Sequence, residues 1–180
     1  MSLKRGPAAR METIMNKIRK VAALAFTLAA TMAVTAFSAE ASTTVNVSLW
    51  DKGANAQMAM GLAYTGTGTV DLSTATMGIK ASPAEAKPGV VTFKVTNDSK
   101  DTVHEMIVMY LADPTKPLPY IDADKKVDED KAGDKGEVSE LDPGKSGSLT
   151  VNLKAGTYLL ICNVAGHFEA GMWTTFTVKP

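Results

Sequence analysis

Short apolar runs separated by turn residues limit the fold of this chain more than any other feature. Residues 45–49 alternate apolar and polar side chains, as a half-buried strand does. Pro88-Gly89 then marks a turn, and helical periodicity is almost absent from residue 42 onward. Six further strands are expected at 77–81, 90–97, 103–111, 148–153, 156–162 and 173–178, with the runs at 148–153 and 156–162 paired as a hairpin. This pattern predicts an all-β antiparallel sandwich or barrel.

Two segments of the body do not follow this pattern. Residues 54–77 are rich in Gly, Ala and Thr and carry no clear prediction of structure. Residues 113–140 form a long polar segment with a dense charge cluster at 122–135. We expect a surface excursion there, since the segment is too polar for a core. The charge cluster is interpreted as a solvated loop, with a docking role as the alternative.

Charge is distributed unevenly along the 180 residues. Of the 19 Lys and Arg, six lie in residues 1–41, which leaves 13 Lys and no Arg for residues 42–180. Of the 19 acidic residues, two lie in residues 1–41, which leaves 17 for the remainder. An arginine-free body with this slight acidic excess is a poor candidate for binding nucleic acid.

The N-terminal region is typical of a secretory signal. Lys17, Arg19 and Lys20 precede an uncharged apolar run at 21–37, and Ala39-Glu40-Ala41 matches the pattern that a signal peptidase accepts. We therefore expect residues 1–41 to be an extension with a signal peptide and 42–180 to be the mature domain. Cleavage after Ala41 would leave an exported protein, periplasmic or otherwise, with no stable membrane insertion. An uncleaved anchor is the alternative, because the run approaches the length of a spanning helix.

The residues that bind metals gather in one loop. Cys162, the single Cys of the chain, ends one expected strand, Met172 begins the next, and His167 lies halfway between them. The second of the two His residues, His104, begins a separate expected strand. Two imidazoles, a thiolate and a weak axial thioether form the ligand set of a type 1 copper centre. The sequence therefore predicts a copper site of His104, Cys162, His167 and Met172.

Other interpretations of the same residues are weaker. Cys162 alone could be a buried apolar residue, or a nucleophile with His167 as its base. The nucleophile hypothesis leaves His104 and Met172 without a role. Zinc has little reason to select a thioether. A copper enzyme is disfavoured because its additional copper centres would need more than the two His of this chain.

The loop and its surroundings resemble the cupredoxins. The spacing Cys-x4-His-x4-Met at 162–172 is similar to that of rusticyanin and auracyanin, and the pattern Pro88-Gly89, then 93–97 and His104, also resembles the family. The resemblance covers roughly residues 77–180. It implies a Greek-key β-sandwich, a single type 1 copper ion at one end, and the four ligands named above. One departure is Glu105, which stands where several family members have the Asn or Ser that joins the two ligand loops.

The resemblance also implies a function. We expect a monomeric, non-enzymatic one-electron carrier between a protein donor and a protein acceptor, which dock near His167. Phe168, Ala170 and Gly171 could form an apolar docking rim, or they could simply pack inside the loop. The alternative function is copper tolerance or delivery. It is suggested by Met58, Met60 and Met77, whose thioethers could bind additional Cu(I), although ordinary packing explains them as well.

Overall fold

The structure is a computed structural model that describes residues 42–67 and 69–180, and two β-sheets dominate it. The predicted signal segment lies outside the described residues. The first sheet has the strand order β2-β1-β4-β9. Its members are β1 (Thr43–Asp51), β2 (Met77–Ser82), β4 (Gly89–Asn97) and β9 (Ser146–Leu153).

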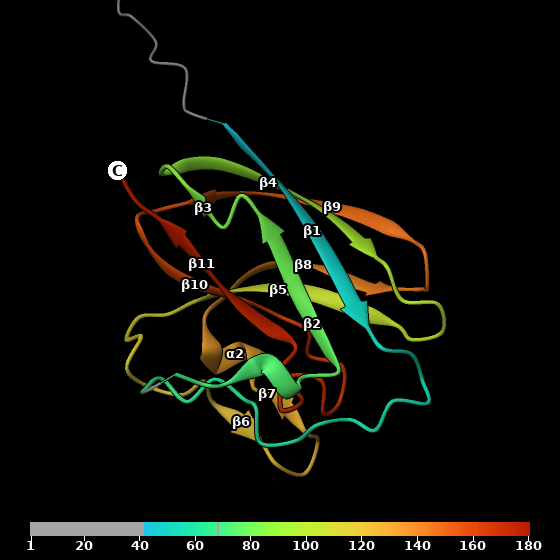
Figure 1. Ribbon diagram of the computed structural model, residues 1–180. Helices are drawn as coiled ribbons and strands as arrows, with labels where there is room; N and C mark the ends of the chain where they lie inside the picture. The colour runs from blue at the N-terminus through green and yellow to red at the C-terminus, as the bar shows by residue number, and fades with distance from the viewer. Residues whose placement is uncertain (1–41, 68) are drawn as a thin grey trace, which may run out of the picture. The chain divides into compact units, whose positions relative to one another are not determined.

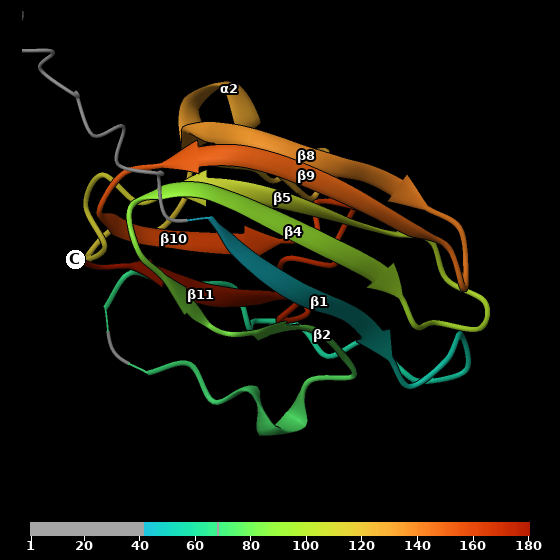
Figure 2. The ribbon, with the colours of Figure 1, turned by 90° about the horizontal axis from the view of Figure 1, so that it is seen from above.

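The second sheet has the order β3-β11-β10-β5-β8. Its members are β3 (Glu85–Ala86), β5 (His104–Tyr110), β8 (Asp134–Leu141), β10 (Gly156–Ile161) and β11 (Trp173–Val178). The two sheets face each other as layers (Figures 1 and 2). Strands β4 and β5, and likewise β9 and β10, are consecutive along the chain but belong to different sheets. The prediction of an all-β sandwich is thus confirmed.

Side-chain alternation explains why the first sheet covers one face of the core. Along β4, Val91, Phe93 and Val95 are fully buried, whereas Thr92 and Lys94 lie on the other face. Phe93 meets Phe176 of the opposite sheet edge to face, with ring centroids 5.2 Å apart. Burial of each such side chain stabilises the fold by about 1.5–3 kcal/mol. The alternation therefore selects which face of β4 turns inward.

Strand β10 differs because both of its faces are buried. Leu160 contributes to the core between the sheets, while Leu159 and Ile161 belong to a second apolar cluster on the outer side of the second sheet. Residues from two long connections complete this outer cluster. They include Tyr64, Val70 and Leu72 from the segment after β1, and Leu118, Val127 and Ala132 from the segment after β5.

One prediction about connections is wrong. The runs 148–153 and 156–162 do not form a hairpin: β9 pairs with β4, and β10 pairs with β5 and β11. The physical reason is their different burial, since β9 needs one solvated face and β10 needs none. Most strand pairs of the described residues are antiparallel, as predicted, and two pairs, β1 with β4 and β11 with β3, are parallel.

The segment 113–140 is only partly a surface excursion. It contains β6 (Tyr120–Ile121), β7 (Lys126–Val127) and the short helix α2 (Glu129–Ala132). Its end is β8, which pairs with β5 as an edge strand of the second sheet. Edge strands tolerate many charges, so a polar run can still be a strand.

The segment between β1 and β2 crosses one end of the sandwich with little regular structure. It contains a 3-10 helix at Leu72–Thr74. In Figure 1 this teal segment runs below the ends of β1 and β2, beside the red loop that follows β10. Within the described residues, no helix has the length and apolarity needed to span a membrane.

Candidate metal centre

His104, Cys162 and His167 meet at the end of the sandwich that this segment crosses. One donor atom from each of them lies within 4.8 Å of the others. The Cys162 Sγ is 3.3 Å from the His167 Nδ1 and 3.9 Å from the His104 Nδ1, and the two Nδ1 atoms are 3.3 Å apart. All three side chains are buried. Residues that are 63 positions apart in the chain thus form one compact cluster.

The orientation of His104 is set by a residue that the sequence did not single out. Its Nε2 lies 2.8 Å from the Asp51 Oδ2 at the end of β1. A carboxylate that accepts a hydrogen bond from one ring N–H fixes the tautomer and leaves the other nitrogen free to bind a metal. Asp51 also accepts a hydrogen bond from the Gly53 amide at 2.7 Å. Nothing in the spacing of Asp51 and His104 could have revealed this contact, because it depends on how β1 and β5 pack.

The loop from Cys162 to Met172 is closed by its own backbone. The Cys162 amide donates to the Met172 carbonyl at 3.0 Å, and the Met172 amide donates to the His167 carbonyl at 3.0 Å. Gly171 has a φ of +90°, and a Cβ there would lie 3.0 Å from the Leu72 Cδ2. Met172 is fully buried and belongs to the same core cluster as Cys162. These hydrogen bonds keep Met172, which carries the thioether, close to His104, Cys162 and His167.

Burial keeps the three side chains in their uncharged forms. It raises the pKa of the Cys162 thiol to about 12. Burial, together with the neighbouring His104, lowers the pKa of His167 to about 4. It also lowers the pKa of His104, against the opposing effect of Asp51. At neutral pH the cluster therefore presents two neutral imidazoles and a thiol whose proton a metal must displace.

Glu105 connects the strand of His104 to the loop of Cys162. Its backbone amide donates to the Cys162 Sγ at 3.5 Å. Burial raises the pKa of its carboxyl to about 7, while a hydrogen bond from the Asn163 backbone lowers that pKa. The Glu105 carboxylate thus has a contact with the cysteine loop at the position where the resemblance led us to expect Asn or Ser.

Two long connections pack against the loop from opposite directions. The Asn163 side chain accepts from the Val127 amide at 2.7 Å and donates to the Val127 carbonyl at 3.0 Å and to Glu129 at 2.7 Å. On the other side, the Leu62 amide donates to the Glu169 carbonyl at 2.8 Å. The Trp173 indole donates to the Leu62 carbonyl at 2.7 Å. The loop is therefore held between the segments that follow β5 and β1.

The same packing decides between the two interpretations of the loop residues around His167. Phe168 and Ala170 are buried, and Gly171 faces Leu62, Leu72 and Ala75. These residues pack inside the fold and do not form an exposed rim. The segment that covers them had no predicted structure, so this arrangement could not be predicted.

Met58, Met60 and Met77, three of the methionines outside the loop, occupy different environments. Met77 is buried, with 7% of its surface exposed, whereas Met58 and Met60 are 38% and 48% exposed. A cavity of about 350 Å³ borders His167, and both Met58 and Met77 line it. Met60 is not among its lining residues.

The residues present fit a type 1 copper ion. Two imidazole nitrogens and a thiolate sulfur lie close enough to share one ion, and the thioether residue is positioned by the same loop. This donor set is the one such a centre uses. The carboxylate bound to His104 supplies the outer contact that metal-binding histidines usually have.

Comparison with known proteins gives matches of three kinds. A family model described as the sulfocyanin (SoxE) domain matches residues 44–179. Auracyanin-B from Chloroflexus aurantiacus is 54% identical over 41 residues, which are 22% of this chain and 17% of auracyanin-B. The aligned segment thus spans less than a fifth of that protein.

Two solved structures are similar over most of the chain. Reduced auracyanin from Roseiflexus castenholzii has 19% identity and a TM-score of 0.47, and the match covers 78% of this chain and 99% of that one. Rusticyanin from Thiobacillus ferrooxidans has 18% identity and a TM-score of 0.47, with 77% of each chain covered.

Proposed function

Because the chain belongs to the sulfocyanin (SoxE) domain family, we propose that it carries single electrons between redox proteins, with copper bound by His104, Cys162, His167 and Met172. The chain is a cupredoxin, and its cofactor is type 1 copper. The observation that carries the proposal is the buried cluster of two Nδ1 atoms and one Sγ within 4.8 Å of one another.

Each residue of the cluster has a definite part in this function. When bound, copper supplies a one-electron couple. Cys162 offers a thiolate and Met172 a thioether, both of which suit Cu(I), while the imidazoles of His104 and His167 also suit Cu(II). Burial of all four side chains excludes water from the site. The backbone bonds of the loop restrain its geometry, which limits ligand movement when the oxidation state changes.

We further propose that the redox partners dock near His167. Its imidazole borders the cavity beside the site, and 5% of its surface is exposed, whereas His104 and Cys162 have no exposed surface. A cupredoxin of this kind is not an enzyme, so the partners are a protein donor and a protein acceptor rather than an organic substrate. The proposal that the protein is exported rests on the sequence pattern of residues 17–41 alone.

Voltammetry of the copper-loaded protein tests the carrier function. The expected result is one copper per chain and a reversible one-electron wave, with no turnover of substrates by the protein alone. Copper tolerance or delivery, the second candidate, predicts additional Cu(I) bound per chain. Met60 does not share the cavity of Met58 and Met77, so the described residues do not assemble the three-methionine cluster that a second tight site would need. An irreversible wave, or a stoichiometry above one, would contradict the carrier function.

A further inference from the structure

The cavity beside His167 contains donor atoms that the electron-carrier function does not use. Its lining includes Met58, Met77 and Asp101, together with Asp51, whose carboxylate is already bonded to His104. Its lining contains no Lys. The cavity is therefore a negatively charged space with two soft sulfur donors, and it borders one ligand of the copper site.

His167 is the ligand of the site through which an ion in this cavity can reach the centre. His104 and Cys162 are fully buried and absent from the lining of the cavity, and Asp51 occupies the Nε2 of His104. The imidazole of His167, by contrast, forms part of the cavity wall while its Nδ1 points to Cys162.

Met58 lies at the exposed side of this space and Met77 at its buried side. Met58 is 38% exposed, which is uncommon for a large apolar side chain in the described part of this chain. Its Sδ is 3.6 Å from the position that a Cβ on Gly166 would take, directly beside His167. Met77 is 7% exposed and begins β2. The two methionines thus line the same cavity, Met58 near the solvent and Met77 near the core.

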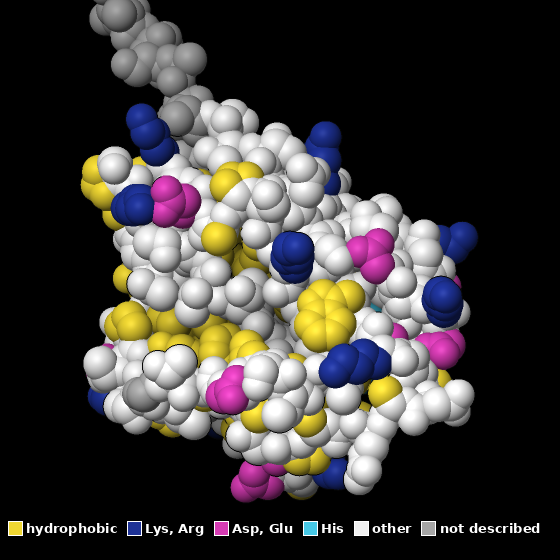
Figure 3. All heavy atoms as spheres, viewed as in Figure 1, with side chains coloured by type: hydrophobic (Ala, Val, Ile, Leu, Met, Phe, Trp, Pro, Cys, Tyr) yellow, Lys and Arg dark blue, Asp and Glu magenta, His cyan; other side chains and the backbone are white. Residues whose placement is uncertain are grey.

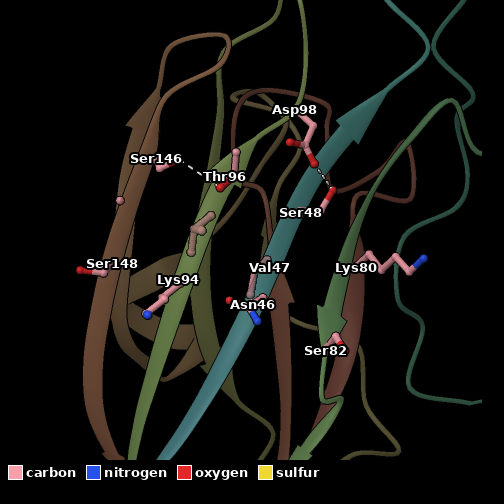
Figure 4. A pocket seen from close by; sticks show the side chains of 12 residues that line it. Asn46, Val47, Ser48, Lys80, Ser82, Lys94, Thr96, Asp98, Ser146 and Ser148 are labelled. Atoms are coloured by element: carbon pink, nitrogen blue, oxygen red, sulfur yellow. Dashed lines mark hydrogen bonds between the residues drawn. The ribbon is translucent and has the colours of Figure 1, made fainter.

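A larger furrow elsewhere on the molecule lacks these donors. It has a volume of about 800 Å³ and lies on the outer face of the first sheet, over Asn46, Ser48, Lys94 and Ser148 (Figure 4). Its lining contains Lys80 and Lys94 and no Met, His or Cys. A copper ion would find only hard donors and positive charge there.

We propose that the cavity is the entry route for Cu(I), in which Met58 and then Met77 bind the ion transiently and pass it to His167. The proposal rests on the proposed copper site, because the route ends there. Thioethers favour Cu(I) over Cu(II), so the route is selective for the reduced ion. The transfer is ligand exchange: each thioether gives way to the next donor, the Cys162 thiol releases its proton, and no electron moves.

The test follows transfer of Cu(I) from its coloured bicinchoninate complex to the metal-free protein. We expect Met58→Leu and Met77→Leu each to slow the loss of colour about 10-fold, in the range known for contacts just outside a metal site. The control is Met60→Leu, an exposed methionine outside the cavity, which should load at the wild-type rate. Loading with Cu(II) should be equally fast in all variants, because thioethers bind that ion weakly.

Two further measurements separate the possible failures. After loading and oxidation, all variants should show the same absorption band and potential, since none of the four proposed ligands is changed. Wild-type loading rates in Met58→Leu and Met77→Leu would overturn the entry route. Equal slowing of Cu(I) and Cu(II) would also overturn it, because a steric effect would then explain the result. Failure of the wild-type protein to form the absorption band would instead overturn the proposed function.

Discussion

At the scale of single residues, the metal centre depends on groups that do not bind the metal. Asp51 holds the Nε2 of His104, and the Glu105 amide donates to the Cys162 Sγ. The first contact connects His104 to the end of β1, and the second connects Cys162 to the start of β5. The ligand types set the chemistry, and these neighbours set their orientation and protonation.

Loss of the Asp51 charge should weaken copper binding. Asp51→Asn keeps the size of the side chain but removes the negative charge that favours the ligating tautomer of His104. We expect Cu(I) affinity to fall about 10- to 100-fold, as measured by competition with a chelator. Asp98→Asn is the control, because Asp98 is bonded to Ser48 and does not contact the cluster. Equal affinities of the two variants would show that Asp51 does not position His104.

Replacement of Met172 should change the potential and leave the thiolate bond in place. Met172→Leu keeps volume and burial but removes the weak axial donor, and the axial ligand is one of the groups that tune the potential of such a centre. The expected result is an intense absorption band as in the wild type, together with a shifted reduction potential by voltammetry. Met109→Leu is the control, since Met109 is equally buried but belongs to the outer apolar cluster. An unchanged potential would remove Met172 from the ligand set.

At the scale of elements, two long connections brace the loop that carries three of the proposed ligands. One is attached through Asn163 to β7 and α2, and the other through Trp173 to Leu62. Tyr64 packs edge to face on Trp173, with centroids 5.3 Å apart. The connections thus complete the outer apolar cluster and restrain the loop together.

Removal of the Asn163 amide should destabilise the fold through one of these connections. Asn163→Ala leaves the buried Val127 amide and carbonyl without their partner. Because an unpaired buried group costs about 1–3 kcal/mol, we expect the free energy of unfolding to fall by about 2 kcal/mol or more. Urea unfolding of the metal-free protein measures this change. Asn152→Ala, at an exposed position of β9, should have little effect, and a similar loss in both variants would refute the bracing role.

At the scale of the whole molecule, a sandwich core supports a metal site at one end, and the face shown in Figure 3 is mixed in charge. On the face shown in Figure 3, Lys and acidic side chains are scattered among uncharged ones, and hydrophobic side chains gather in a furrow. On that face no block of one sign is present. Recognition of partners there would depend on shape and single charges rather than on a strong field.

Copper binding should release one proton per chain at pH 7. The pKa of Cys162 is about 12 in the folded protein, so the thiol is protonated and must lose its proton to bind the metal. The pKa of His167 is about 4, and that of His104 is also lowered, so the imidazoles contribute no proton. Calorimetric titration in buffers of different ionisation enthalpy measures this number. Release of two or more protons would show that a histidine is charged before the metal binds.

The sequence predicted the parts of this molecule that depend on local patterns. The apolar run between turns at 90–97 predicted β4, and the spacing within 162–172 predicted the loop that brings Cys162 and His167 together. Contacts that depend on the packing of distant strands could not be predicted, and Asp51 beside His104 is the main example. Residues 113–140 were too charged to indicate β8, because an edge strand needs few apolar residues.

One measurement tests the central claim most directly: the visible absorption and EPR spectra of residues 42–180 after addition of one equivalent of Cu(II). The predicted result is an intense thiolate-to-copper band and a type 1 EPR signal, both lost in Cys162→Ser. A colourless protein with only an ordinary Cu(II) signal would contradict the copper site and, with it, the carrier function.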